Sequence, residues 1–224
     1  SSSCTVYGVP DKIPVKETAL IKPAFSPYGY TKQVGERVLT DFFKTKPNSS
    51  LTLLRYFNPI GAHTSALIGE LPIGVPSNLV PYITQTGIGK RKKLTVFGKD
   101  YDTDDGTCIR DYIHVVDLAN AHVASFKKGL NSKESIKTYN VGTGKGVSVL
   151  EVISAFEKVS NQKLNYEFGP RRVGDVPEIY SDNELIKNKL GWEAKFSLED
   201  CLEHSWKWEK NLVKFKYKSE KKQD

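Results

Sequence analysis

The chain has 224 residues and a formal net charge of +7, with 38% hydrophobic and 26% charged residues. This composition is typical of a globular protein with one large or two small domains. No apolar run approaches the roughly 20 residues of a membrane helix, so we expect no membrane partner. The basic stretches, residues 89–93 and 214–222, are interpreted as a solvated loop and tail, so we expect no nucleic-acid partner either.

Cysteine and histidine usage argues against disulfides and metals. The three cysteines, Cys4, Cys108 and Cys201, are widely spaced and odd in number. This pattern is unlike a disulfide framework and favours a reducing, cytoplasmic setting. The four histidines have no metal-ligand spacing with the cysteines, so we predict no metal site.

The first sixty residues predict a strand, a helix and a second strand. Cys4–Gly8 is interpreted as the end of a strand that enters a loop. A helix is predicted from Ser26 and Pro27, because serine is a favourable N-cap and proline suits the first helical position; it should close near Pro47. The apolar run Leu51–Phe57 has the length and character of a strand. This order is the crossover of a parallel sheet.

The rest of the chain predicts further α/β structure. Residues 60–108 are rich in glycine and proline and predict loops around one helix and one short strand. Ser148 and Glu151 fit the capping box of a later helix. In chain order, the predicted elements are a helix at Pro81–Gly87, a strand at Leu94–Phe97, a helix from Asp117, a strand at Thr138–Val141, the capped helix, and helices at Asn183–Leu190 and from Ser197.

Tyr28 and Lys32 are the first candidates for chemistry. They lie four residues apart on the first predicted helix, so their side chains share one face. A phenol is a weak base at neutral pH, and an ammonium group a few ångströms away favours the phenolate form. The same spacing occurs by chance on many helices, where it is only a surface pair. The pair therefore suggests a general base without establishing one.

Longer motifs surround this pair. Residues 1–8 read S-S-S-C-T-V-Y-G, residues 27–32 P-Y-G-Y-T-K, residues 54–63 L-R-Y-F-N-P-I-G-A-H, and residues 97–112 F-G-K-D-Y-D-T-D-D-G-T-C-I-R-D-Y. The segments I-H-V-V-D-L-A, Y-N-V-G-T-G and R-R-V-G-D follow. In this order and spacing, the motifs resemble the UDP-glucose 4-epimerases of the extended short-chain dehydrogenase/reductase family. The resemblance covers nearly the whole chain except the Lys-rich tail.

The resemblance implies an α/β fold, made of the C-terminal part of a Rossmann-type parallel sheet plus a smaller α/β substrate-binding domain. Residues 1–59 would be the remnant of the NAD-binding domain, residues 60–212 the UDP-sugar-binding domain, and residues 213–224 a Lys-rich tail. The helix near 117–130 is expected to pack back on the first domain. The family's dinucleotide loop precedes the matched region and the chain has no methionine, so we expect a fragment without the N-terminal NAD-binding part.

The family's functional residues carry over to positions of this sequence. The resemblance implies that Ser3 relays the proton of the sugar 4-hydroxyl, that Tyr28 is the general base, and that Lys32 binds the nicotinamide ribose. Tyr28, Lys32 and Tyr56 would contact the cofactor, NAD. The UDP-sugar would be bound by Ser3, Asn58, Asn78, Leu79, Phe97, Arg110, Tyr112, Arg172 and Asp175. Taken one at a time, most of these residues also have an ordinary structural explanation: Ser3 could be a serine of a terminal loop, and Phe97 an aromatic residue of the core.

The implied activity is reversible NAD-mediated oxidation at sugar C4, which interconverts UDP-glucose and UDP-galactose in galactose metabolism. The full-length protein would be a homodimer. One alternative is a related sugar-nucleotide dehydratase or decarboxylase, although a dehydratase usually has an acidic pair where Val6 and Tyr7 follow Thr5. Another is an inactive, truncated UDP-sugar-binding remnant, and we expect the 224-residue chain alone to lack epimerase activity and to hold NAD poorly.

A glycine-rich segment, Gly142–Gly146, lies between a predicted strand and a predicted helix. Its sequence G-T-G-K-G has the spacing G-x-G-x-G, not G-x-G-x-x-G, and it lacks the Walker ending. We therefore do not expect a dinucleotide to bind there.

Overall fold

The computed structural model describes residues 1–46, 48–130 and 135–220, with side chains as far as Leu212. The helices are η1 (Cys4–Tyr7, a 3-10 helix), α1 (Pro27–Phe43), α2 (Leu79–Gly87), α3 (Val115–Gly129), α4 (Val149–Ser160), α5 (Glu184–Leu190) and α6 (Leu198–Glu220). The strands are β1 (Ser2–Ser3), β2 (Ser50–Tyr56), β3 (Asn58–Ile60), β4 (Leu94–Phe97), β5 (Ile109–Arg110), β6 (Tyr112–His114), β7 (Ser135–Val141), β8 (Val147–Ser148), β9 (Tyr166–Gly169) and β10 (Glu178–Ile179). The fold is α/β, as predicted.

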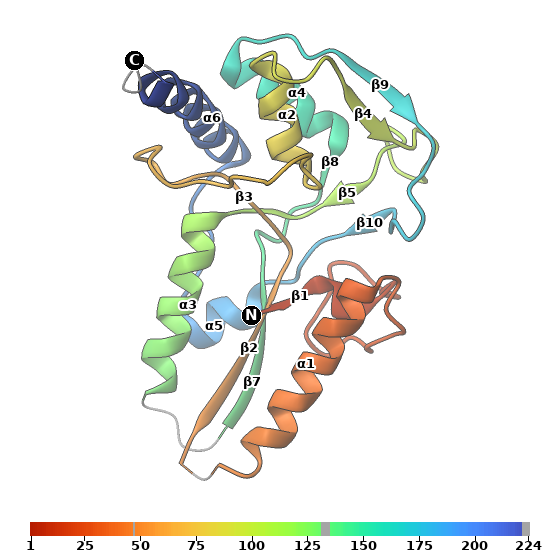
Figure 1. Cartoon of the computed structure of the whole chain (residues 1–224). Coiled ribbons are helices and arrows are strands. Elements are labelled where there is room, and N and C mark those ends of the chain that lie inside the picture. Colours follow the sequence, from red (N-terminus) through yellow and green to blue (C-terminus); the bar gives the residue numbers. More distant parts are fainter. Residues whose placement is uncertain (47, 131–134, 221–224) are drawn as a thin grey trace.

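A parallel sheet of strand order β1-β2-β7 supports one part of the molecule. Helix α1 lies on one side of this sheet, and α3 and α5 lie on the other (Figure 1). Successive strand residues face opposite sides. Accordingly, Leu54 packs in the core beneath α3 and α5 with Tyr139 and Trp192, while Arg55 reaches Glu36 of α1.

A second core lies among α2, α4 and α6, at the end of the molecule away from α1 (Figure 1). Phe156 of α4 is fully buried there, and its ring meets that of Trp206 of α6 edge-on, with centroids 5.5 Å apart. The parallel pair β4–β9 contributes Leu94 and Val96 to the same core. Because its apolar side chains come from separate elements, this core holds the helices against the strand pair.

Strand β6 joins the two cores. Tyr112 belongs to the core around Phe156, whereas the next residue, Ile113, belongs to the core beneath α3. His114 ends the strand, and its Nε2 lies 3.0 Å from Nδ1 of His204 in α6. Burial, and secondarily the neighbouring His204, lower the pKa of His114 to about 4. His114 is therefore neutral at pH 7 and links β6 to α6 through a hydrogen bond between imidazoles.

Most predicted elements are present, with shifted ends. The prediction of a strand at Cys4–Gly8 is wrong: the strand is Ser2–Ser3, paired with β2, and η1 follows because the Ser3 side chain caps it. Helix α3 begins at Val115, before Asp117, because Nδ1 of His114 accepts a hydrogen bond from the Val116 amide. Pro47, the expected end of the first helix, lies outside the described residues, and α1 ends at Phe43.

The predicted capping box at Ser148 and Glu151 is confirmed. Strand β7 pairs with β2 although it lies within the range 60–212, and α3 packs on β2; the domain boundaries themselves stay predictions. The predicted tail starts within the last helix, since the backbone of α6 continues to Glu220, and residues 221–224 lie outside the described part. None of the helices so described is both long and apolar enough to cross a membrane.

Candidate active site

The carboxyl ends of β1 and β2 form the edge at which most of the predicted catalytic residues meet. Ser3 ends β1, Tyr56 ends β2, and the two are register partners. In open parallel sheets this is the edge where ligands bind. Tyr28 is the second residue of α1 and is 56% exposed, so its hydroxyl is accessible. Nζ of Lys32 lies 5.5 Å from the centroid of the Tyr28 ring, which brings the expected pair together.

Tyr56 lies near Tyr28 at this edge. Burial is the main cause that raises the pKa of Tyr56, a hydrogen bond with Ser1 opposes the rise, and the nearby Tyr28 adds to it. The Tyr56 hydroxyl donates to Ser1 Oγ at 2.7 Å and contacts Nε2 of His122 on α3. His122 was not singled out from the sequence, because no local pattern links α3 to the end of β2.

Ser3 is nearly buried, and its orientation is fixed by Thr5. Its Oγ accepts hydrogen bonds from the Thr5 amide at 3.2 Å and from Thr5 Oγ1 at 3.0 Å. Because both bonds use its lone pairs, the Ser3 hydroxyl keeps its own proton available for donation. Thr5 is therefore a positioning residue that the sequence reasoning passed over, although the T-V-Y-G motif contained it.

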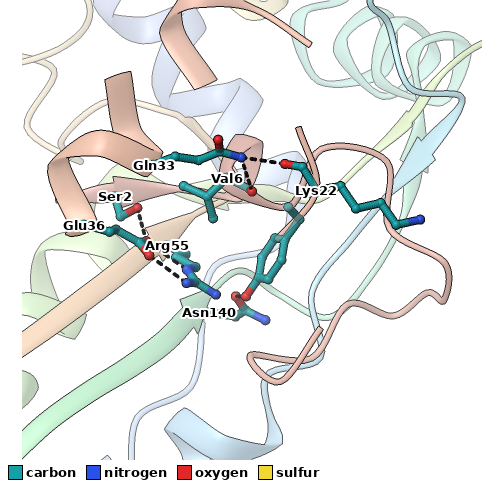
Figure 2. A network of polar contacts seen from close by, with 8 residues as sticks. Ser2, Val6, Lys22, Gln33, Glu36, Arg55 and Asn140 are labelled. Carbon is teal, nitrogen blue, oxygen red and sulfur yellow. Dashed lines mark hydrogen bonds and ion pairs between the residues drawn. The ribbon is translucent and has the colours of Figure 1, made fainter. Parts of the chain in front are cut away.

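A buried ion pair anchors α1 to the sheet behind this edge. Arg55 of β2 donates to both carboxylate oxygens of Glu36 on α1, at 2.9 and 2.7 Å, and both side chains are nearly inaccessible to solvent. The Ser2 hydroxyl also donates to this carboxylate (Figure 2). Glu36 follows Lys32 by four residues and therefore continues the helix face of Tyr28 and Lys32. The pair thereby fixes that face relative to β1.

The same network continues towards β7. The Arg55 guanidinium lies 4.8 Å from the centroid of the Tyr7 ring, and the Tyr7 hydroxyl donates to Asn140 Oδ1 at 2.6 Å. Burial raises the pKa of Tyr7 to about 12, so it remains a neutral donor. Gln33 of α1 adds hydrogen bonds to the carbonyls of Val6 and Lys22, so α1, η1 and the following loop are tied together. In the sequence, only Arg55 within the apolar run Leu51–Phe57 hinted at this network.

A second group gathers predicted substrate residues from three segments. Arg110 Nη2 of β5 lies 3.8 Å from Asp175 Oδ1, and Arg110 Nη1 donates to the carbonyl of its neighbour Ile109. The guanidinium of Arg172 lies 5.3 Å from the ring centroid of Phe97, at the exposed end of β4. Two guanidinium groups, a carboxylate and an aromatic face suit a phosphate, a ribose and a planar base, respectively.

The remaining predicted substrate residues lie in several places. Asn58 starts β3, and its backbone amide donates to the carbonyl of Asp111 at 2.9 Å. Asn78 is the N-cap residue of α2, where its side-chain amide donates to Glu70 at 2.8 Å, and Leu79 follows it. Tyr112 is buried in the second core, and burial raises its pKa. Their roles in substrate binding stay predictions.

Metal binding has no support in the geometry. Within residues 1–46, 48–130 and 135–220, no group of three or more His, Cys, Asp or Glu side chains is placed to hold a metal ion. All three cysteines are free and buried. Burial raises the pKa of Cys4 to about 12, so this thiol stays protonated at neutral pH.

Sequence comparison identifies related proteins. The family model described as GDP-mannose 4,6 dehydratase matches residues 1–205. The UDP-glucose 4-epimerase of Haemophilus influenzae is 49% identical over 214 residues, which are 96% of this chain and 63% of that protein. The corresponding enzyme of Bacillus subtilis is 50% identical over 213 residues, with 95% and 62% covered. The chain thus spans slightly less than two thirds of the length of these curated relatives.

Solved structures give the same result. The UDP-glucose 4-epimerase of Bifidobacterium longum, in complex with NAD+ and UDP, matches with a TM-score of 0.90 and 45% identity over 94% of this chain and 62% of that one. The enzyme from Stenotrophomonas maltophila, with bound NAD and formylated UDP-arabinopyranose, matches with a TM-score of 0.91 and 48% identity over 95% and 63%. The chain therefore belongs to the GDP-mannose 4,6 dehydratase family within the extended short-chain dehydrogenases/reductases, and it is a homologue of the UDP-glucose 4-epimerases.

Proposed function

We propose that the protein serves as a UDP-glucose 4-epimerase, which interconverts UDP-glucose and UDP-galactose. One observation carries the proposal: Ser3, Tyr28, Lys32 and Tyr56 converge on the carboxyl edge of a parallel sheet. The group formed by Arg110, Asp175, Arg172 and Phe97 supplies the chemistry that a UDP moiety requires, and the relatives named above support the assignment.

NAD is the cofactor that this proposal requires, and the solved relatives bind it. When bound, NAD accepts a hydride from C4 of the sugar and returns it. Lys32, Tyr28 and Tyr56 fit this cofactor, because they place an ammonium group and two phenols at one accessible edge of the sheet. In the proposed arrangement, Lys32 binds the nicotinamide ribose and the two tyrosines lie beside the nicotinamide.

Proton transfer falls to Ser3 and Tyr28. Ser3 accepts the proton of the sugar 4-hydroxyl on the lone pair that Thr5 Oγ1 uses in the free chain. It passes its own proton to the Tyr28 phenolate, so one proton leaves the sugar and one phenol forms. Lys32 is the neighbouring cation, because its Nζ lies 5.5 Å from the centroid of the Tyr28 ring. The Thr5 amide holds the Ser3 oxygen in place throughout. The reverse transfer restores the hydroxyl after the sugar has turned.

Inversion requires a firm hold on UDP and a loose hold on the sugar. Arg110 and Arg172 would bind the diphosphate by charge-assisted hydrogen bonds, Asp175 would bind the uridine ribose, and Phe97 would contact the uracil. The 4-keto sugar, tethered through the diphosphate, turns and presents its other face. Reduction from that face inverts C4.

Two alternatives remain distinguishable. A dehydratase usually has an acidic pair after the active-site threonine, but Val6 and Tyr7 follow Thr5 here, and both are fully buried in η1. The second alternative is a UDP-sugar-binding remnant without turnover. It is supported by the pair of Arg110 and Asp175, because these proposed UDP-binding residues are not among the residues proposed to bind NAD. The expected homodimer and the cytoplasmic setting stay predictions.

A coupled assay of UDP-galactose conversion, with NAD added, tests the proposal. In a full-length version of the protein, Tyr28→Phe removes the proposed base and should lower kcat by at least two orders of magnitude. Tyr30→Phe is the matched control, because Tyr30 is also exposed on α1 but lies off the face of Tyr28 and Lys32. Near-normal turnover of Tyr28→Phe would remove the base assignment. A chain that binds UDP by calorimetry but shows no turnover would favour the remnant.

A further inference from the structure

We propose that Asp111 is the internal anion of the glycine loop Gly142–Gly144 and a positioning residue for the UDP-sugar site. Its carboxylate would position two residues of the proposed site. Arg110 is adjacent to Asp111 in sequence, and the Asn58 amide is hydrogen-bonded to the Asp111 backbone. The expected effect on UDP binding rests on the proposed function. The positioning role of Asp111 rests only on the contacts of its buried side chain.

The Asp111 carboxylate is enclosed by hydrogen-bond donors. The side chain is fully buried. Its Oδ1 accepts from the amide and hydroxyl of Thr143 at 2.8 and 2.7 Å. Its Oδ2 accepts from the Gly144 amide at 3.2 Å and from the amide and hydroxyl of Ser181 at 3.1 and 2.6 Å. A buried carboxyl group without such donors would be strongly unfavourable, and these five hydrogen bonds satisfy both of its oxygens.

The glycine loop has the shape of an anion site that is already filled. Consecutive amides of Thr143 and Gly144 point at one carboxylate, as successive backbone N–H groups do in anion-binding nests. A Cβ added to Gly142 would lie 2.3 Å from Asp111 Oδ2 and 2.4 Å from Ser181 Oγ. Gly142 is therefore required for the approach of this carboxylate. The amides of this glycine-rich segment thus bind a carboxyl group of the same chain.

The carboxylate connects this loop to the proposed UDP site. Arg110, the preceding residue, ends β5, which pairs with β10 through Ile179. Ser181 follows β10, so its bonds to Asp111 hold β10 and β5 at one end. The backbone carbonyl of Asp111 also accepts from the Asn58 amide at 2.9 Å. Loss of the carboxylate would therefore free the loop after β7 and the end of β10, and would displace the Arg110 guanidinium and Asn58.

The test compares two conservative variants of the full chain. Asp111→Asn keeps the shape but replaces one acceptor oxygen with an amide that faces other donors. Asp117→Asn is the matched control, because Asp117 is also buried and accepts from the amides of Lys195 and Phe196 at 2.9 and 3.0 Å. Calorimetric titration with UDP, at a temperature where both variants are folded by circular dichroism, should show a Kd at least tenfold higher for Asp111→Asn and little change for Asp117→Asn.

Amide hydrogen exchange supplies a readout without ligand. Asp111→Asn should accelerate exchange at Asn58, Thr143 and Ser181 well beyond the acceleration seen there in Asp117→Asn. Equal UDP affinities and equal exchange for the two variants would overturn the proposal. If Asp111→Asn does not fold, Ser181→Ala removes one hydroxyl donor and should raise the Kd several-fold. If the unchanged chain fails to bind UDP, the proposed function fails, and the exchange comparison alone decides the role of Asp111.

Discussion

At the scale of single residues, the ion pair of Glu36 and Arg55 makes stability depend on pH. Burial alone would raise the pKa of Glu36, but hydrogen bonds from Arg55 and Ser2 outweigh it and hold the pKa below its ordinary value. The folded state therefore binds a proton less readily than the unfolded chain. This contribution to stability is fully present above the unfolded pKa of about 4.3 and is lost as the pH falls through the lower folded pKa.

Glu36→Gln should lower the free energy of unfolding by about 3 kcal/mol at pH 7, because it leaves the Arg55 charge buried without its partner. The difference from the unchanged chain should shrink as the pH falls below the unfolded pKa of about 4.3, because the unfolded chain takes up the proton first. Urea unfolding at pH 7 and pH 3.5 measures both values. Glu203→Gln is the control, since the exposed Glu203–Lys207 pair should contribute less than about 0.5 kcal/mol. An equal loss of unfolding free energy in Glu36→Gln at both pH values would contradict the coupling between Glu36 protonation and stability.

At the scale of elements, α1 is held by contacts at its start and by the Glu36–Arg55 ion pair, whereas the surface at Gly35 is open. The Ser26 side chain accepts from the Gly29 amide at 3.1 Å, and Pro27 occupies the first turn. Gly29 is buried where the helix crosses η1, and an added Cβ would lie 3.2 Å from the Thr5 carbonyl oxygen. Gly35 lies farther along the helix, and a Cβ there would meet nothing within 4 Å.

Gly35→Ala should therefore raise the free energy of unfolding by about 0.5–1 kcal/mol, because alanine restricts the unfolded chain and fits the helix without strain. Gly29→Ala should bring no such gain, since its methyl group would press against the backbone of η1. The midpoint of urea unfolding, at an unchanged m-value, measures both changes. A loss of stability in Gly35→Ala would show that the outer surface of α1 is covered by a contact within the folded chain.

Local sequence patterns predicted the helices and strands well. They could not predict contacts between side chains that are far apart in the sequence. Ser26 and the Ser148–Glu151 capping box marked helix starts because caps act over three residues. The proximity of Tyr28 and Lys32 followed from helix geometry alone. The partners of Asp111, in contrast, are 32 and 70 residues away, and no local pattern identifies them. The grouping of Arg110 with Asp175 came only from the family resemblance, for the same reason.

At the scale of the whole molecule, the two cores share β6 and are not separable. Tyr112 and Ile113 are neighbours on this short strand, yet their side chains enter different cores. Strand β6 also pairs with β3 and contacts α6 through His114. Unfolding of either core would expose one side of β6 and remove the support of the other. The molecule should therefore unfold in one cooperative transition, as small two-state domains do.

Tryptophan positions make this prediction measurable. Trp192 lies in the core beneath α3, and Trp206 lies in the core around Phe156. The double variant Trp206→Phe/Trp208→Phe reports only Trp192, while Trp192→Phe/Trp208→Phe reports only Trp206 in the second core. In each variant, the fluorescence midpoint in urea should coincide with the midpoint from circular dichroism, because both cores unfold together. A fluorescence transition that precedes the circular dichroism transition in either variant would show that one core opens alone, and that β6 does not couple them.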